Sequence, residues 1–207
     1  MDKTYLLRLL QSLKKVMGEN RDYLIELDSV VGDGDLGLTM GDGFAAAYDA
    51  VADTQENDLG KILYQAGKAM STAVPSTMGT LMASGLMSAG KVLKGKESTD
   101  MQGIHDLFAA YEEGVAKRGK ANVGDKTFLD GLHPAVVSLG GSVMAGEALP
   151  QAAQKAYEAA EKGYHDTKGM LAVHGRAATR GEASRELEDP GAAVAMLMMK
   201  ALARSAG

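Results

Sequence analysis

The chain of 207 residues contains no cysteine and no tryptophan, and only four prolines. The absence of cysteine excludes disulfide bonds and thiolate metal ligands, which leaves oxygen atoms and histidine nitrogens as the common metal ligands. A protein without disulfides fits a reducing compartment, and we expect a cytoplasmic location. The scarcity of proline leaves room for long, uninterrupted helices.

Long apolar runs are missing as well. The first ten residues mix charged with apolar side chains, unlike the apolar region of a secretory signal peptide. Near the other end, the nearly uncharged residues 192–199 fall far short of the roughly 20 residues that span a bilayer. The formal net charge of −5 weakly disfavours nucleic acid as a ligand. We therefore expect neither a membrane nor a nucleic acid as partner.

Apolar residues at helical spacing are abundant. Hydrophobic residues make up 45% of the chain, and apolar positions recur every three or four residues with few alternating runs. We expect helices at residues 3–17, 21–31, 39–52, 58–72, 77–93, 101–117, 127–144, 150–164 and 191–205. This pattern predicts an all-α protein of antiparallel helices around one core, forming one domain over residues 1–207. Residues 165–190 lack the periodicity, which is typical of a lid, a binding loop or a disordered segment.

Three carboxylates stand close together near the start of the chain. Asp28, Asp33 and Asp35 are interleaved with glycines that allow tight turns, so the three side chains can converge. Converging anions need a cation or many hydrogen bonds, and carboxylate oxygens select Mg²⁺, Ca²⁺ or Mn²⁺. A calcium loop of the EF-hand type is excluded, because its twelfth position would be Phe44. Mg²⁺ bridging phosphates fits the loop, whereas the alternative is a set of aspartates that cap helices and shape turns.

Three further segments could bind an anion. Ser76 and Thr77 stand where a helix begins, a place that suits phosphate but equally suits ordinary capping. The basic, glycine-bearing residues 117–127 are either part of a binding site or a solvated turn. Arg176 and Arg180 could clamp an anion, or could be surface arginines of a mobile loop.

Taken together, these segments resemble one family over essentially the whole chain. The chain is similar to the nucleotide-binding L subunit of dihydroxyacetone kinase and to the equivalent C-terminal domain of single-chain kinases. The matching stretches are residues 27–37, 118–127, 175–184 and 189–192. The resemblance implies a barrel of eight antiparallel amphipathic helices with ADP or ATP bound at one end.

The resemblance also assigns the site. It implies that Asp28, Asp33 and Asp35 hold two Mg²⁺ ions on the nucleotide phosphates, and that these aspartates and Arg176 carry the catalysis. The resemblance implies phosphate contacts at the starts of the third and fifth helices. Base and ribose contacts are implied between the sixth and seventh helices. The loop before the last helix is implied to cover the nucleotide. The implied nucleotide-binding residues are Leu36, Gly37, Leu38, Thr39, Ser76, Thr77, Gly119, Phe128, Arg176, Asp189, Pro190 and Gly191.

The chain departs from the family pattern at three places. Leu36 stands where the family usually has histidine, and Thr39 where it usually has asparagine. The turn before Gly79 is shorter and poorer in glycine than the family's phosphate-binding turn. All three aspartates are present, so the departures concern the placing of the phosphates rather than the metal.

The implied function is phosphoryl transfer to a small ketose such as dihydroxyacetone, with the acceptor on a partner K subunit. The resemblance further implies a phosphotransferase-system M subunit that rephosphorylates the bound nucleotide, with exchange of free ATP as the alternative. Two other functions stay open: a nucleotide-sensing regulatory subunit without catalysis, and a kinase subunit for another short ketose such as erythrulose. The sequence also leaves a homodimer open.

Overall fold

The computed structural model describes all residues from Met1 to Gly207 and consists of α-helices and one 3-10 helix. The elements are α1 (Lys3–Glu19), α2 (Arg21–Val31), α3 (Leu36–Asp49), α4 (Leu59–Ala73), α5 (Thr77–Val92), α6 (Met101–Gly119), α7 (Phe128–Met144), α8 (Leu149–Asp166), η1 (Ala177–Glu186) and α9 (Pro190–Ala206). The predicted all-α class is confirmed. None of these helices combines the length and the apolar character needed to cross a membrane.

Local sequence signals set most of the helix starts. Side-chain oxygens accept hydrogen bonds from first-turn N–H groups at Asp2, Asp58, Ser76, Asp100, Thr127 and Asp189. Each such cap satisfies a backbone donor that has no partner inside the helix and contributes about 1 kcal/mol. Three of these caps, at the starts of α5, α7 and α9, lie at the same end of the molecule, as the topology below requires.

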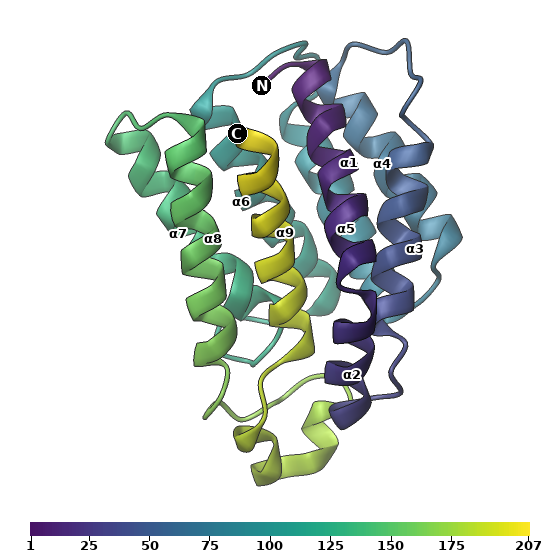
Figure 1. Ribbon diagram of the computed structural model, residues 1–207, viewed down its shortest axis with the longest axis vertical. Coiled ribbons are helices and arrows are strands. Elements are labelled where there is room, and N and C mark those ends of the chain that lie inside the picture. Colours follow the sequence, from purple (N-terminus) through teal and green to yellow (C-terminus); the bar gives the residue numbers. More distant parts are fainter.

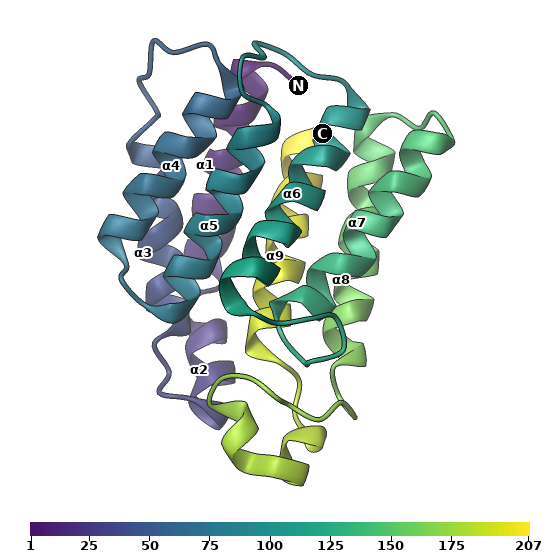
Figure 2. The same cartoon turned by 180° about the vertical axis from the view of Figure 1, so that it is seen from behind.

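The helices form a closed ring (Figure 1). The ring consists of α1 and α3 to α9: α1 contacts α3, each later helix contacts the next along the chain, and α9 contacts α1. Helix α2 packs on α3 outside this ring. Short connections make consecutive helices antiparallel, so α3, α5, α7 and α9 all begin at one end, and Figure 2 shows the same arrangement from behind. Both chain termini lie at the opposite end. Four positive helix-dipole ends therefore gather where η1 and the end of α2 also lie.

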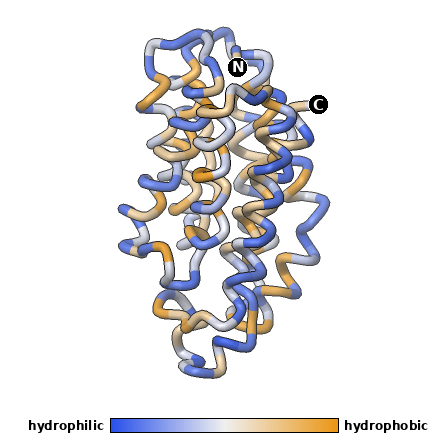
Figure 3. The backbone as a smooth tube through the Cα atoms, turned by 90° about the vertical axis from the view of Figure 1, so that its left-hand side faces the viewer, coloured by the Kyte–Doolittle hydropathy of each residue, from blue (hydrophilic) through white to orange (hydrophobic).

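A single cluster of 50 buried apolar residues fills the ring. Figure 3 shows hydrophobic and hydrophilic residues interspersed along the helical backbone, as expected where one helix face packs inward and the other meets water. Helix α9 is the most deeply packed, because most of its residues are buried and many of them are alanines. It contacts α1, α7 and α8. This packing fixes the start of α9 at the end of the ring where the other helix N-termini gather.

Besides shifts of one to three residues at several helix ends, the structure differs from the sequence expectation in three respects. Helix α3 begins at Leu36, not near residue 39, because the Asp35 carbonyl already accepts the Thr39 N–H at 2.9 Å. The 165–190 segment is not wholly irregular, since it contains η1. The count of eight helices is not confirmed: nine α-helices are present. Helices α1 and α2 are separate because the Asn20 side chain bonds back to the Val16 carbonyl at 2.8 Å.

Candidate functional site

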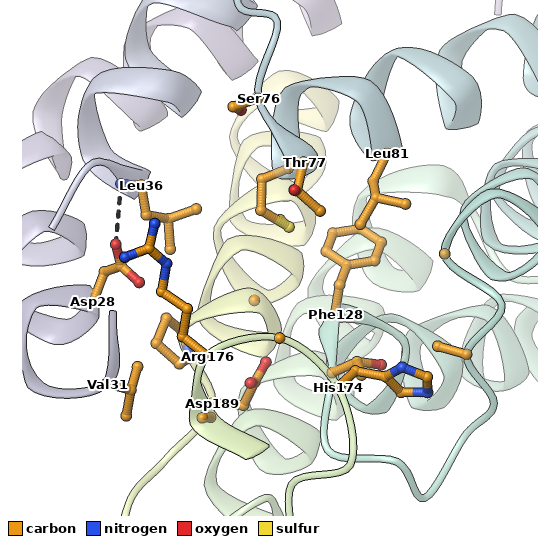
Figure 4. A pocket seen from close by; sticks show the side chains of 18 of the residues that line it. Asp28, Val31, Leu36, Ser76, Thr77, Leu81, Phe128, His174, Arg176 and Asp189 are labelled. Carbon is orange, nitrogen blue, oxygen red and sulfur yellow. Dashed lines mark hydrogen bonds between the residues drawn. The ribbon is translucent and has the colours of Figure 1, made fainter. Parts of the chain in front are cut away.

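A cavity of about 380 Å³ opens at the end of the ring where α3, α5, α7 and α9 begin. Among the residues that the sequence assigned to the site, the following line it: Asp28, Asp33, Asp35, Leu36, Ser76, Thr77, Gly119, Phe128, Arg176, Asp189, Pro190 and Gly191. Figure 4 shows carboxylate and guanidinium groups on one side of this cavity and the Phe128 ring on the other. The cavity is therefore amphipathic along its length.

The three aspartates converge at the polar side. Asp28, Asp33 and Asp35 each offer one carboxylate oxygen, and these oxygens all lie within 4.8 Å of one another. Burial raises the pKa of Asp28, and the negative charges of Asp33 and Asp35 raise it further. The Leu36 N–H at the start of α3 points to Asp28 Oδ2 at 3.4 Å, an opposing contact that stabilises the ionised form. A cluster of hard carboxylate oxygens is the donor set that Mg²⁺ prefers.

The turn between α2 and α3 is what brings the carboxylates together. Gly34 has φ +73°, and a side chain there would also meet the Ser29 hydroxyl at 2.5 Å. Gly32 leaves room for the Asp28 carboxylate, which would lie 2.6 Å from a Cβ atom at that position. The glycines read from the sequence thus have a geometric role in forming the cluster.

Arg176 comes from the segment that follows α8. Its guanidinium forms an ion pair with Asp33, with 2.5 Å between Nη2 and Oδ2. Arg180 on η1 donates a hydrogen bond to the Val30 carbonyl of α2. Residues 167–189, here called the covering segment, therefore reach from the end of α8 across to the aspartate cluster, and they place one cation beside it.

The start of α5 offers hydrogen-bond donors to the cavity. Ser76 Oγ accepts the Gly79 N–H at 3.0 Å, so the Ser76 hydroxyl is an ordinary helix cap, as one of the two sequence interpretations had it. The exposed Thr77 hydroxyl is not engaged in this way, and the N–H groups of Thr77 and Met78 have no hydrogen-bond partner in the chain. Helix N-termini with free N–H groups attract phosphate oxygens. Gly79 is required here because a Cβ atom would meet the Val74 carbonyl oxygen at 2.2 Å.

The other side of the cavity is apolar. Leu81, Val115, Ala121 and Leu129 line it together with Phe128. His174 also lines it and is held by Asp125, with 3.1 Å between Nε2 and Oδ2. Flat aromatic heterocycles bind in such apolar slots.

Three residues assigned to the site are not among those that line the cavity. Gly37 is buried between α3 and α2, Leu38 is 41% exposed, and Thr39 is buried. The Leu38 and Thr39 side chains do not form part of the cavity wall, and Gly37 has no side chain. Conversely, sequence reasoning did not assign the cavity residues Val31, Met78, Leu81, Val115, Ala121, Thr127, Leu129, His174, Gly175 and Ala177. Most of these are small or apolar, and helical periodicity does not distinguish a cavity wall from the core.

Asp189 is buried at the start of α9. Its Oδ2 accepts the Ala192 N–H at 2.7 Å, while its own N–H donates to the Thr167 hydroxyl at 2.9 Å. Burial raises the pKa of Asp189 to about 7, with the charge of Asp130 adding to the rise. The folded state therefore binds this proton more tightly than the unfolded chain does, where the pKa is about 4.

This shift predicts a pH-dependent stability in the nucleotide-free protein. The stabilisation from proton uptake by Asp189 is present in full below about pH 4 and is lost as the pH rises through about 7. We expect an Asp189→Asn variant, which keeps a hydrogen-bond acceptor, to gain in melting temperature relative to the parent protein as the pH increases from 5 to 8. Thermal melts at several pH values measure this gain. If the difference in melting temperature between the two proteins stayed constant from pH 5 to 8, the raised pKa of Asp189 would be contradicted.

Comparisons with known proteins agree on one family. A sequence model described as DAK2 domain matches residues 30–204. The chain is 32% identical over 206 residues to the PEP-dependent dihydroxyacetone kinase, ADP-binding subunit DhaL, of Escherichia coli (strain K12), covering 100% of this chain and 98% of that protein. It is 35% identical over 198 residues to L-erythrulose 1-kinase of Mycolicibacterium smegmatis, covering 94% of this chain but 34% of that protein.

Two solved structures have the same fold. The native dihydroxyacetone kinase of C. freundii matches with a TM-score of 0.76 and 23% identity, over 99% of this chain and 35% of that chain. The same kinase in complex with AMP-PNP and Mg²⁺ matches with a TM-score of 0.73 and 24% identity, over 99% of this chain and 34% of that one. The chain thus spans about a third of the length of these larger kinases.

Proposed function

Since the chain belongs to the DAK2 domain family, we propose that it is the nucleotide-binding, phosphoryl-transferring subunit of a dihydroxyacetone kinase. One observation carries this proposal: three carboxylates converge at one side of a cavity whose opposite side is apolar, with helix N-termini around it. The E. coli relative, named an ADP-binding subunit, supports it. Residues 1–207 then form one nucleotide-binding domain.

The metal ligands are Asp28, Asp33 and Asp35. Their oxygens are close enough to share a cation. Burial, with the neighbouring negative charges of Asp33 and Asp35, raises the pKa of Asp28, and a bound cation would offset this by favouring the ionised carboxylate. Bound Mg²⁺ would supply electrostatic stabilisation for the charge that develops on the transferred phosphoryl oxygens. We propose two such ions. The C. freundii kinase, whose complex contains AMP-PNP and Mg²⁺, is consistent with this choice of metal.

The chain's own groups orient the nucleotide. The Arg176 guanidinium lies beside the aspartates and can turn from Asp33 to a phosphate oxygen, where it would stabilise the developing charge. The free N–H groups and hydroxyl at the start of α5 would bind phosphate oxygens. Phe128 and Gly119 line the part of the cavity that fits the base and ribose. The covering segment would exclude water from the phosphates.

No general base for the acceptor hydroxyl lies beside the aspartates. His174 is the only histidine of the cavity, and it lies at the apolar side, paired with Asp125. We therefore assign binding and activation of dihydroxyacetone to a partner K subunit. The PEP-dependence in the E. coli relative's name supports rephosphorylation of the bound ADP by a phosphotransferase-system M subunit.

A reconstitution tests the proposal. We expect the purified chain, mixed with K subunit and dihydroxyacetone, to form dihydroxyacetone phosphate when Mg²⁺-nucleotide and a phosphoryl donor are present, and to form none without this chain. A phosphorylated M subunit and free ATP are supplied in separate arms, which identifies the donor. Product in neither arm, while the chain still binds ADP, would overturn the proposal and favour a nucleotide-sensing role.

The acceptor has one alternative with specific support. The 35% identity to L-erythrulose 1-kinase favours a four-carbon ketose as second candidate. Running the same assay with erythrulose in place of dihydroxyacetone separates the two, because the preferred ketose gives the higher kcat/KM.

A further inference from the structure

A buried lysine outside the cavity lining holds the covering segment in place. Lys126 is only 2% exposed, and it lies in the connection between α6 and α7, next to the α7 cap. Its Nζ donates hydrogen bonds to the carbonyls of Ser184 at 2.6 Å, Leu187 at 2.5 Å and Met170 at 3.3 Å. All three acceptors are backbone carbonyls of the covering segment.

The Lys126 ammonium group is fully engaged by these bonds. An ammonium group has three donors, and here each donor has a carbonyl acceptor from a different part of the same segment. Burial lowers the pKa of Lys126, whereas the charge of Asp189 opposes this effect. Without the ammonium group, the partly buried carbonyls of Met170 and Leu187 would lose this donor, and the Ser184 carbonyl would keep only the Leu187 N–H, which disfavours the observed conformation of the segment.

The backbone of Lys126 adds an independent observation. Its φ is +61°, a left-handed conformation that non-glycine residues seldom adopt. Residues kept in this region are held by their surroundings and cluster at functional sites. The adjacent Asp125 is tied to the same segment, because its carbonyl accepts the Val173 N–H at 3.3 Å and its carboxylate contacts His174. Two consecutive residues thus fasten the covering segment to the α6–α7 connection.

The ends of the segment are also fastened where they leave α8 and enter α9, through the bonds of Thr167 to the Tyr164 carbonyl, of Tyr164 to Glu188 and of Ala192 to Asp189. Between these ends, the contacts that reach toward the aspartate cluster are exposed. The Arg176 guanidinium that pairs with Asp33 is 65% exposed, and Arg180, which bonds to the Val30 carbonyl, is also exposed. Exposed contacts of this kind contribute little to stability, because water competes for the same hydrogen-bonding groups. Lys126 is therefore a buried attachment that bonds three carbonyls of the segment at once, whereas the contacts of Arg176 and Arg180 are exposed.

We propose that Lys126 is a positioning residue that holds the covering segment over the bound nucleotide and so sets how slowly the nucleotide leaves. This inference rests on the proposed nucleotide-binding function. Lys126 is not among the cavity residues, so it acts through the segment that carries Arg176 and Gly175. Its loss should raise the dissociation rate of Mg²⁺-ADP more than it changes the association rate, because a less firmly held segment opens more often over the bound nucleotide.

Two kinds of measurement test the proposal on two variants of Lys126 and one control variant. Lys126→Met removes the ammonium group and keeps side-chain length, and Lys126→Gln is a milder version that retains two donors. Lys120→Met is the control, because Lys120 lies in the same connection with φ +53° but is exposed and makes no side-chain bond to the segment. Hydrogen exchange is measured on the nucleotide-free proteins, and the dissociation rate of Mg²⁺-ADP by stopped flow.

We expect Lys126→Met to lose amide protection in residues 167–189 while α4 and α5 keep theirs, and to release Mg²⁺-ADP about tenfold faster. Lys126→Gln should show a smaller change in the same direction, and Lys120→Met none. If Lys126→Met does not fold, the Gln variant decides the result. Parental protection of the segment and a parental dissociation rate in the folded variant would overturn the proposal. So would equal loss of protection in all helices. Failure of the parent protein to bind ADP would refute the proposed function, whereas the exchange result would still report on Lys126.

Discussion

An Asp33→Asn or Asp35→Asn variant is expected to transfer phosphoryl groups at least about 1,000-fold more slowly than the parent protein in the reconstituted assay. Each substitution replaces a charged ligand of the aspartate cluster by a neutral amide of the same shape. In the proposed function this cluster, whose oxygens lie within 4.8 Å of one another, binds Mg²⁺. A missing charge weakens Mg²⁺ binding and also removes stabilisation of the transferred phosphoryl group.

The fold should survive these substitutions. Both side chains are exposed, and the Asp33–Arg176 ion pair is a surface contact worth at most about 1 kcal/mol. Asp42→Asn is the matched control, since Asp42 lies on α3 with an exposed side chain paired to Arg21 at 3.6 Å and does not line the cavity. Calorimetry of Mg²⁺-ADP binding and initial rates with the K subunit measure the effect. Full activity in either cluster variant would refute the metal assignment.

The polar part of this site could be read from the sequence, because its chemistry is local. Asp28, Asp33 and Asp35 lie within eight residues, and the glycines among them indicate the turn that makes them converge. The apolar spacing also predicted the helices, and α2, α4 and α5 begin and end within about one residue of the expected positions. Both signals depend on residues close in the sequence.

The apolar wall and the fastening of the covering segment depend on distant residues. Leu81 and Val115 have the same helical spacing as core positions, and only the closed ring leaves them facing a cavity. Lys126 donates to carbonyls 44 to 61 residues away in the sequence. Every residue has a backbone carbonyl, so the sequence does not show which ones accept these bonds. The sequence showed a basic connection at residues 117–127, but it could not separate a buried lysine from a solvated one.

Gly37 has a structural role that the sequence did not indicate. The resemblance assigned it to nucleotide binding, and the structure also places it where α3 packs closely against α2. A Cβ atom at this position would lie 2.1 Å from the Arg21 carbonyl oxygen and 2.8 Å from Ile25 Cγ1. The first clash is with backbone, so no side-chain rotation relieves it. Helix α2 would have to move away from α3, and α2 carries Asp28 one turn beyond Ile25.

A Gly37→Ala variant should therefore lose both stability and metal-nucleotide affinity. We expect a loss of about 3 kcal/mol in the free energy of unfolding, the upper part of the range for overpacking in a tight interior. Mg²⁺-ADP should also bind more weakly, because displacing α2 moves Asp28 relative to Asp33 and Asp35. Gly41→Ala, one turn further along α3, is the control: nothing lies within 4 Å of its Cβ position, so alanine should be neutral or stabilise by up to about 1 kcal/mol. Urea denaturation and calorimetry measure the two effects, and identical behaviour of the two variants would show that the α2–α3 contact does not position the cluster.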